Sequence, residues 1–232
     1  MHIPDGFIEA PVSAAGAVVA AGGVALAARK AAADLDDRAV PLAGLTSAYV
    51  FAMQMLNFPV AAGTSGHLVG GCLAAMLVGP WLACISMAVV IVVQALVFAD
   101  GGLSAIGLNM ILMGVVPVLV ATGATHLARV AVPATRRAVM GTAAVAAWAS
   151  VVASALVFTA FFAIGGAADV SLRDVTAAMV GVHALIGIGE AVITAATLGA
   201  VIGTRPDLVH AARHVRRAAA TSTAPPTVGA PA

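Results

Sequence analysis

Seven apolar segments follow one another along the chain, separated by short polar turns. They cover about residues 12–28, 41–56, 67–78, 81–99, 103–129, 139–164 and 174–202. A helix that crosses a bilayer needs roughly 20 apolar residues, and most of these segments approach or exceed that length. The segment at 67–78 is short, so we expect part of the loop before it to enter the protein at membrane depth, where irregular backbone is tolerated only if it lines a site. The pattern predicts an all-α polytopic membrane protein with about seven transmembrane helices.

The composition supports a membrane protein. Of the 232 residues, 62% are hydrophobic and only 9% are charged, with a mean hydropathy of +1.07, whereas about a quarter of the residues in soluble domains are charged. The net charge of +1 gives no reason to expect a nucleic acid partner. The two cysteines, Cys72 and Cys84, lie inside apolar segments and are interpreted as core residues rather than as a disulfide or a thiolate metal site.

The distribution of basic residues predicts the orientation. With the N-terminus outside, ten of the eleven basic residues fall on one side and only Arg173 falls on the other; the ten are Arg29, Lys30, Arg38, Arg129, Arg136, Arg137, Arg205, Arg213, Arg216 and Arg217. The positive-inside rule makes the crowded side cytoplasmic. We therefore expect a leader at 1–11 outside, a transmembrane domain at 12–204, and a basic, disordered cytoplasmic tail at 205–232, which has few large apolar residues.

The leader carries unusual chemistry at its first two residues. The Met1 amine, the His2 backbone nitrogen and the His2 imidazole can close two fused chelate rings on one metal ion, and Pro4 and Gly6 bend the chain that follows. No basic residues precede the first apolar segment, which argues against a cleaved signal peptide. The bulk of His2 also disfavours removal of Met1.

Four polar residues lie inside or beside apolar segments, where unpaired polar groups are costly: Asn57, His67, His183 and Glu190. His183 and Glu190 are seven residues apart and share a helix face; their role is open between a proton relay, support of a metal ligand and a packing hydrogen bond. His67 is expected on the same side as the leader and can add a fourth nitrogen. Four nitrogens in a plane suit Ni(II), Cu(II) or low-spin Co(II).

Five separated motifs resemble the CbiM/NikM family, the substrate-capture membrane components of energy-coupling-factor transporters for cobalt and nickel. They are MHIPDGF (1–7), MQMLNFPVAAGTSGHLVGG (53–71), LVGPW (77–81), IGLNMILMGVVP (106–117) and HALIGIGEAVIT (183–194). The resemblance covers about residues 1–205. It implies a membrane transport protein rather than an enzyme, placed in the bacterial cell membrane and supplying metal, for example for cobalamin biosynthesis.

The resemblance also implies the ligands. The leader is expected to fold back into the bundle and to hold the ion through the Met1 amine, the His2 backbone and ring nitrogens, and the His67 imidazole. Asn57 and Ser65 are expected to hold the leader in place. The second ring nitrogen of His67 needs an acceptor, which is open between Ser65, Asp5 and a backbone carbonyl.

The transported metal stays open between nickel and cobalt, with no prosthetic group expected. The Pro4-Asp5-Gly6 sequence favours nickel in this family. The chain contains no GxxxxGK[ST] phosphate loop and so cannot hydrolyse ATP itself. The resemblance implies partners that can: two cytosolic ATPase subunits, a transmembrane coupling subunit and often a small accessory membrane subunit.

Two other functions compete with metal capture. Gly63-Thr64-Ser65-Gly66 matches a GxSG motif, so Ser65 with His183 or His126 as a base would give a rhomboid-like intramembrane serine protease. The HisxxxAsn motif of that class is absent. A stand-alone secondary transporter would show inverted repeats, and none is found.

Overall fold

The computed structural model describes residues 1–33, 35, 37–60 and 65–213. The helices in this part of the chain are α1 (Ala10–Ala32), α2 (Ala39–Gln54), α3 (Gly71–Val78), α4 (Pro80–Val97), α5 (Ile106–Met110), α6 (Val116–Ala131), α7 (Arg136–Gly165) and α8 (Leu172–Thr204). A π-helical turn, η1 (Ile111–Val115), joins α5 to α6, and two 3-10 turns, η2 (Pro206–Leu208) and η3 (His210–Ala212), follow α8. The two-residue strands β1 (Phe58–Pro59) and β2 (Ser65–Gly66) pair antiparallel, with Phe58 opposite Gly66. The predicted all-α fold is confirmed.

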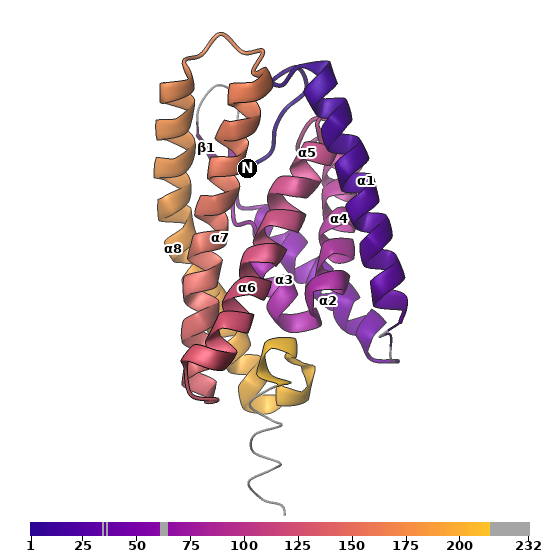
Figure 1. Cartoon of the computed structure of the whole chain (residues 1–232), viewed down its shortest axis with the longest axis vertical. Helices are drawn as coiled ribbons and strands as arrows, with labels where there is room; N and C mark the ends of the chain where they lie inside the picture. The colour runs from indigo at the N-terminus through magenta and orange to yellow at the C-terminus, as the bar shows by residue number, and fades with distance from the viewer. Residues whose placement is uncertain (34, 36, 61–64, 214–232) are drawn as a thin grey trace, which may run out of the picture.

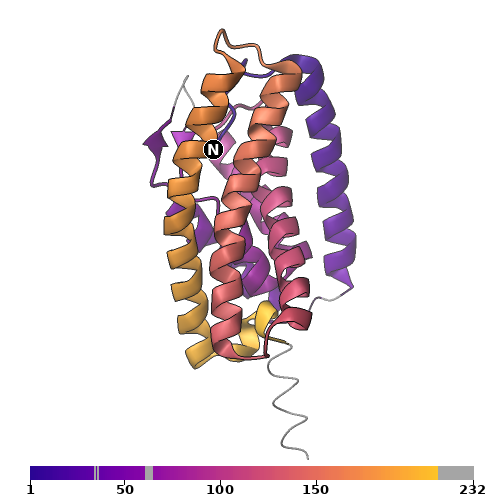
Figure 2. The ribbon, with the colours of Figure 1, turned by 60° about the vertical axis from the view of Figure 1, so that its left-hand side comes forward.

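The long helices run along one axis and surround the short helix α3 (Figure 1). Helix α1 lies at one edge of the bundle and α8 at the opposite edge, and the N-terminus lies between them inside the upper half of the molecule (Figures 1 and 2). The turns η2 and η3 lie at the lower end. The leader and the C-terminal turns therefore lie at opposite ends of the bundle.

Five helices are long and apolar enough to cross a membrane: α1, α4, the continuous α5–η1–α6 helix, α7 and α8. Helix α2 is apolar but has 16 residues, and α3 has eight. Each predicted apolar segment contains a helix, whereas seven crossings and the outside position of the N-terminus remain predictions. Large apolar side chains such as Leu119 (65% exposed) and Leu185 (70% exposed) point outward, as expected for a surface in contact with lipid.

Local sequence explains the main helix boundaries. The Thr135 and Ser171 hydroxyls cap α7 and α8 by accepting the backbone N–H of the residue three positions on. Pro80 begins α4 directly after Gly79, which has a φ of 88°. Pro117 lies in the first turn of α6, immediately after the π-helical turn. A wider turn is one way in which a helix adjusts to the hydrogen bond that proline cannot donate.

The prediction of a helix over 67–78 is wrong at its start, because α3 begins at Gly71 and His67 lies in the non-helical segment before it. Gly70 has a φ of 75°, a conformation that favours glycine. The backbone N–H groups of Val69 and Gly70 donate to the two carboxylate oxygens of Glu190 on α8, at 2.6 and 2.8 Å. This buried carboxylate satisfies two amides at the N-terminus of α3 that have no partner within the helix, and it fixes the segment that carries His67.

The predicted disordered tail at 205–232 needs a correction over its first nine residues. Residues 205–213 are described and form η2 and η3. Val209, Ala211 and Ala212 are buried in a cluster that also contains Cys72. The expectation counted only large apolar side chains, whereas small ones suffice for this contact. Residues 214–232, for which the same prediction was made, lie outside the described residues.

Candidate metal centre

The leader does not lie on the surface but enters the bundle. Met1 and Ile3 are fully buried, and His2 is only 3% exposed. The side-chain amide of Asn109 on α5 pairs with the backbone of Ile3 in both directions, accepting its N–H at 2.7 Å and donating to its carbonyl at 3.1 Å. The Gly102 N–H donates to the same carbonyl at 2.9 Å. The buried backbone of the leader is thus hydrogen-bonded as it would be in a sheet.

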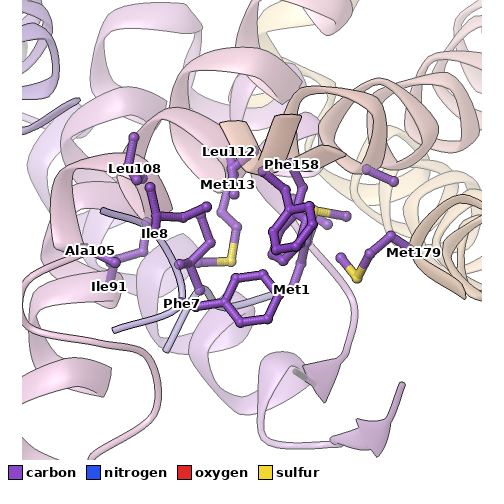
Figure 3. Packing of buried hydrophobic residues seen from close by; sticks show 14 of the residues in the cluster. Met1, Phe7, Ile8, Ile91, Ala105, Leu108, Leu112, Met113, Phe158 and Met179 are labelled. Atoms are coloured by element: carbon purple, nitrogen blue, oxygen red, sulfur yellow. The ribbon is translucent and has the colours of Figure 1, made fainter. Parts of the chain in front are cut away.

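The Met1 side chain is part of the hydrophobic core. Figure 3 shows it among Phe7, Phe158, Met113 and Met179, and all five belong to one buried cluster. Flexible thioethers fill irregular space beside aromatic rings well. Burial of this side chain holds the amine of the same residue inside the bundle.

The outer part of the leader is tied to two neighbouring loops. The Asp5 carboxylate accepts the Ser104 backbone N–H at 2.8 Å and the Ser104 hydroxyl at 2.5 Å, and these bonds lower the pKa of Asp5. The Phe7 carbonyl accepts the Ala167 N–H at 3.0 Å. Asp5 therefore holds the leader and does not contact His67, for which it was one of the open partners.

His2 and His67 meet inside the bundle. His2 Nδ1 and His67 Nε2 are 3.1 Å apart, with ring centroids 4.7 Å apart. Two imidazole nitrogens bound at right angles to one ion, each at about 2.0–2.1 Å, lie about 2.8–3.0 Å apart. The two nitrogens are therefore spaced as neighbouring ligands of a single metal ion.

The hydrogen bond at His67 Nδ1 leaves His67 Nε2 free to bind a metal ion. His67 Nδ1 is 2.7 Å from the Leu68 carbonyl oxygen, which can only accept, so Nδ1 carries the proton. His67 Nε2 then carries a lone pair, the form in which histidine binds metals. The acceptor sought for the second ring nitrogen is a backbone carbonyl.

A chain of hydrogen bonds also fixes which ring nitrogen of His2 carries the proton. The Val69 carbonyl accepts from Gln54 Nε2 at 2.7 Å, so the Gln54 oxygen faces Gln94, whose Nε2 donates to it at 2.9 Å. The Gln94 oxygen then faces His2 Nε2 at 3.2 Å. Because the chain begins at an oxygen that can only accept, every donor in it is fixed, and His2 Nε2 carries the proton. The lone pair of His2 Nδ1 points at His67.

A carboxylate completes a group of acceptors with no donor between them. Asp100 Oδ1 lies 3.1 Å from His2 Nδ1, and Asp100 Oδ2 accepts from Asn57 Nδ2 at 3.1 Å. His2 Nδ1 thus has a second ring nitrogen and a carboxylate oxygen each 3.1 Å away. Such an arrangement repels itself unless a proton or a metal cation lies between the atoms.

Burial keeps the nitrogen donors unprotonated. It lowers the pKa of the Met1 amine from 8.0 to about 4, against the opposing charge of Asp100. It also lowers the pKa of His2, an effect that Asp100 partly offsets. The pKa of His67 is held well below its ordinary value by burial and then by the nearby Met1 amine and His2. At neutral pH these nitrogens are available to a metal ion.

The predicted pair of His183 and Glu190 on α8 is buried, but the two residues do not share a hydrogen bond in the described structure. His183 Nδ1 donates to the Met179 carbonyl at 2.8 Å, and its Nε2 has no hydrogen-bond partner among the described residues. Glu190 binds the backbone that follows His67. Of the roles left open for Glu190, support of a ligand-bearing segment matches these contacts.

The other expected supporting residues fall in different places. Asn57 is exposed and donates to Asp100, which in turn faces His2 of the leader, and the Ser65 side chain lies outside the described residues. Sequence reasoning missed four polar residues that carry the site: Gln54, Gln94, Asp100 and Asn109. Three of them lie in apolar helices, and the cost of burying an unpaired polar group was a signal that could have found them.

Side chains alone do not complete a metal site here. Among the described residues, no group of three His, Cys, Asp or Glu side chains is arranged to hold an ion. The buried Met1 amine is a further nitrogen donor near these rings, close enough to lower the pKa of His67.

The comparison with known families decides the identity. The family described as "Cobalt uptake substrate-specific transmembrane region", CbiM, matches residues 2–208. The chain belongs to the CbiM family. It is therefore a membrane component of metal uptake rather than an enzyme, and the protease interpretation of Ser65 is rejected.

Relatives of this CbiM-family chain carry names of metal transport. It is 39% identical over 209 residues to a protein of Haloquadratum walsbyi named for metal transport, covering 90% of this chain and 93% of the relative. It is 32% identical over 183 residues to the cobalt transport protein CbiM of Sorangium cellulosum, covering 78% and 81%. The fused nickel transport protein NikMN of Rhodobacter capsulatus is 37% identical over 169 residues, covering 71% of this chain and 47% of that longer protein.

A crystal structure of a truncated transition metal transporter has the same fold. The TM-score is 0.81 at 28% identity, over 88% of this chain and 99% of that one. The resemblance to CbiM/NikM in the sequence is thus confirmed.

The Asn109 contact predicts how firmly the leader is held. Asn109→Ala leaves the buried Ile3 N–H without its partner, which costs about 1–3 kcal/mol. We expect hydrogen–deuterium exchange in the N-terminal peptide to accelerate about fivefold to 150-fold, measured by mass spectrometry. Ser104→Ala is the control, because it removes an exposed bond to Asp5 that water replaces; equal exchange in the two variants would contradict this view of the leader.

Proposed function

We propose that this chain is the substrate-capture component of an energy-coupling-factor importer for Ni²⁺ or Co²⁺. The ion is bound by four nitrogens: the Met1 amine, the His2 backbone nitrogen, His2 Nδ1 and His67 Nε2. The observation that carries the proposal is the buried 3.1 Å approach of His2 Nδ1 and His67 Nε2, in which the hydrogen bonds on both rings leave the lone pairs facing each other.

The remaining two donors follow from the chemistry of the leader. The Met1 amine and the His2 backbone nitrogen close chelate rings with His2 Nδ1 by virtue of their positions in the chain. Burial of Met1 at 0% and of His2 at 3% exposure supports an amine that turns inward with its side chain. The Ile3 N–H, by contrast, is bound to Asn109, so the next backbone nitrogen along the chain is already engaged.

The donor set limits the cargo. Four nitrogens in a plane, one of them a deprotonated amide, suit Ni(II) and low-spin Co(II) and suit Mg, Ca or Zn poorly. Relatives are named for nickel and for cobalt. The Pro4-Asp5-Gly6 leader favours nickel through its resemblance to nickel members.

Energy for import comes from other subunits in this proposal. The chain carries no phosphate-binding loop, so two cytosolic ATPase subunits and a transmembrane coupling subunit, with or without a small accessory membrane subunit, would complete the transporter. Its place is the cell membrane, with the leader outside. The basic ends of α1 and α6 and the start of α7 support a cytoplasmic lower end.

Acetylation of the N-terminus tests the chelate. An acetyl group on the Met1 amine removes that nitrogen as a donor and adds atoms in a fully buried space. Loss of an outer-shell partner typically weakens metal binding 10- to 100-fold, so we expect loss of a direct ligand to weaken Ni²⁺ binding by about 100-fold or more. Calorimetry on the purified chain measures this, and the square-planar Ni(II) absorption should vanish as well.

Matched variants accompany that experiment. One glycine added after Ala232 should leave binding unchanged. His67→Ala should abolish tight binding, whereas His126→Ala, which removes an exposed histidine of α6, should not. Unchanged nickel affinity in the acetylated chain or in His67→Ala would exclude the proposed ligands.

Proton release gives a second test. Since the pKa of the Met1 amine is about 4 and those of His2 and His67 are lowered, these groups are already unprotonated at pH 7. Binding should then release about one proton, from the His2 amide, and affinity should fall about tenfold per pH unit from pH 8 to pH 6. Calorimetry in buffers of different ionisation enthalpy counts the protons; release of two or more at pH 7 would contradict this account.

A further inference from the structure

The turn after α4 is built closely around the His2 ring. Ala99 has a φ of 50° and Gly101 a φ of 93°. A Cβ atom on Gly101 would lie 2.8 Å from His2 Cδ2, so the backbone touches the imidazole at this point. The Asp100 N–H donates to the Gln94 carbonyl at 3.0 Å. These contacts give the carboxylate of Asp100 a fixed direction, toward the edge of the His2 ring.

Ala99 is held in a strained conformation to reach this arrangement. It is the only residue other than glycine with a positive φ in the described part of the chain. Such a backbone is energetically unfavourable and persists only where the surrounding structure over-determines it, often at functional sites. Here the strain lies immediately before the carboxylate that faces His2.

Asp100 joins the buried nitrogens to the surface. Its side chain is 19% exposed, against 3% for His2 and 0% for His67. One carboxylate oxygen faces His2 Nδ1, and the other accepts from the exposed Asn57. Among the described residues that contact the His2 ring through polar atoms, it is the one that solvent reaches, since Gln94 and His67 are fully buried.

The distances allow an ion to be passed from oxygen to nitrogen. Asp100 Oδ1 and His67 Nε2 are each 3.1 Å from His2 Nδ1. Ligands bound at right angles at about 2.0–2.2 Å lie about 3 Å apart, so one ion can be shared by His2 Nδ1 with either partner. A hydrated divalent ion exchanges water for a carboxylate oxygen before it meets softer nitrogen donors.

Electrostatic attraction also favours Asp100 as the first contact of the incoming cation. The ion carries +2 and the deprotonated His2 amide −1, which leaves a net +1 in a buried site. Asp100 places a carboxylate oxygen 3.1 Å from His2 Nδ1, and Asn57 donates to its other oxygen. The negative charge of this carboxylate attracts cations to a partly exposed edge of the site.

We propose that Asp100 is the capture residue of this transporter, which binds the incoming divalent cation first and transfers it to His2 Nδ1. The proposal rests on the function proposed above. It adds a carboxylate to the path of the ion without adding a ligand to the final four nitrogens.

Stopped-flow mixing of the full chain, with its native N-terminus, and NiCl₂ tests this role. Electrostatic attraction raises association rates by 10- to 1,000-fold, so Asp100→Asn should slow Ni²⁺ association at least about tenfold. Its final absorption should still report nitrogen coordination, because the four donors remain. Asp100→Glu should recover most of the rate, and added salt should slow the wild type more than Asp100→Asn.

Asp169→Asn is the matched control, since it removes the same charge from an exposed residue in the loop between α7 and α8, at the leader's end of the bundle. It should associate as fast as the wild type. Equal association rates for Asp100→Asn and the wild type would overturn the capture role, and so would loss of nitrogen coordination in Asp100→Asn, because the residue would then only position His2. Absence of square-planar absorption in the wild type would instead reject the proposed function itself.

Discussion

A polar chain terminus can lie inside an apolar bundle only if each of its polar groups finds a partner, and this constraint shapes the upper half of the molecule. Asn109 satisfies the backbone of Ile3, and the glutamines Gln54 and Gln94 satisfy the ring of His2. These residues come from α2, α4 and α5. The buried leader is therefore hydrogen-bonded to α4 and α5 directly, and to α2 through Gln94.

The same constraint explains why α3 is short. The segment 67–70 must stay non-helical to present His67 to the leader, and its freed backbone groups need other partners. Glu190 accepts two amides, and Gln54 donates to the Val69 carbonyl. The polar groups around His67 and those around His2 are thus one connected network, since Gln54 belongs to both. A substitution in the hydrogen-bond network around one histidine should alter the hydrogen bonds of the other.

Periodicity and length were sufficient to locate all the helices, because apolar segments of this length have few alternatives in a membrane. They were not sufficient to place the first residue of α3, which depends on Gly70 and on a carboxylate more than a hundred residues away. The leader and His67 could be linked through topology and family motifs. Asp100 and Asn109 could not be assigned roles, because their partners are backbone atoms and ring nitrogens that only the fold brings near.

The central claim is that the N-terminus itself binds the transported ion together with two histidines. X-ray absorption at the nickel K edge of the purified, Ni²⁺-loaded chain with its native N-terminus tests it most directly. The account predicts four nitrogen neighbours in a plane, with the outer-shell scattering of two imidazole rings. A six-coordinate ion, or scattering from fewer than two imidazoles, would contradict it.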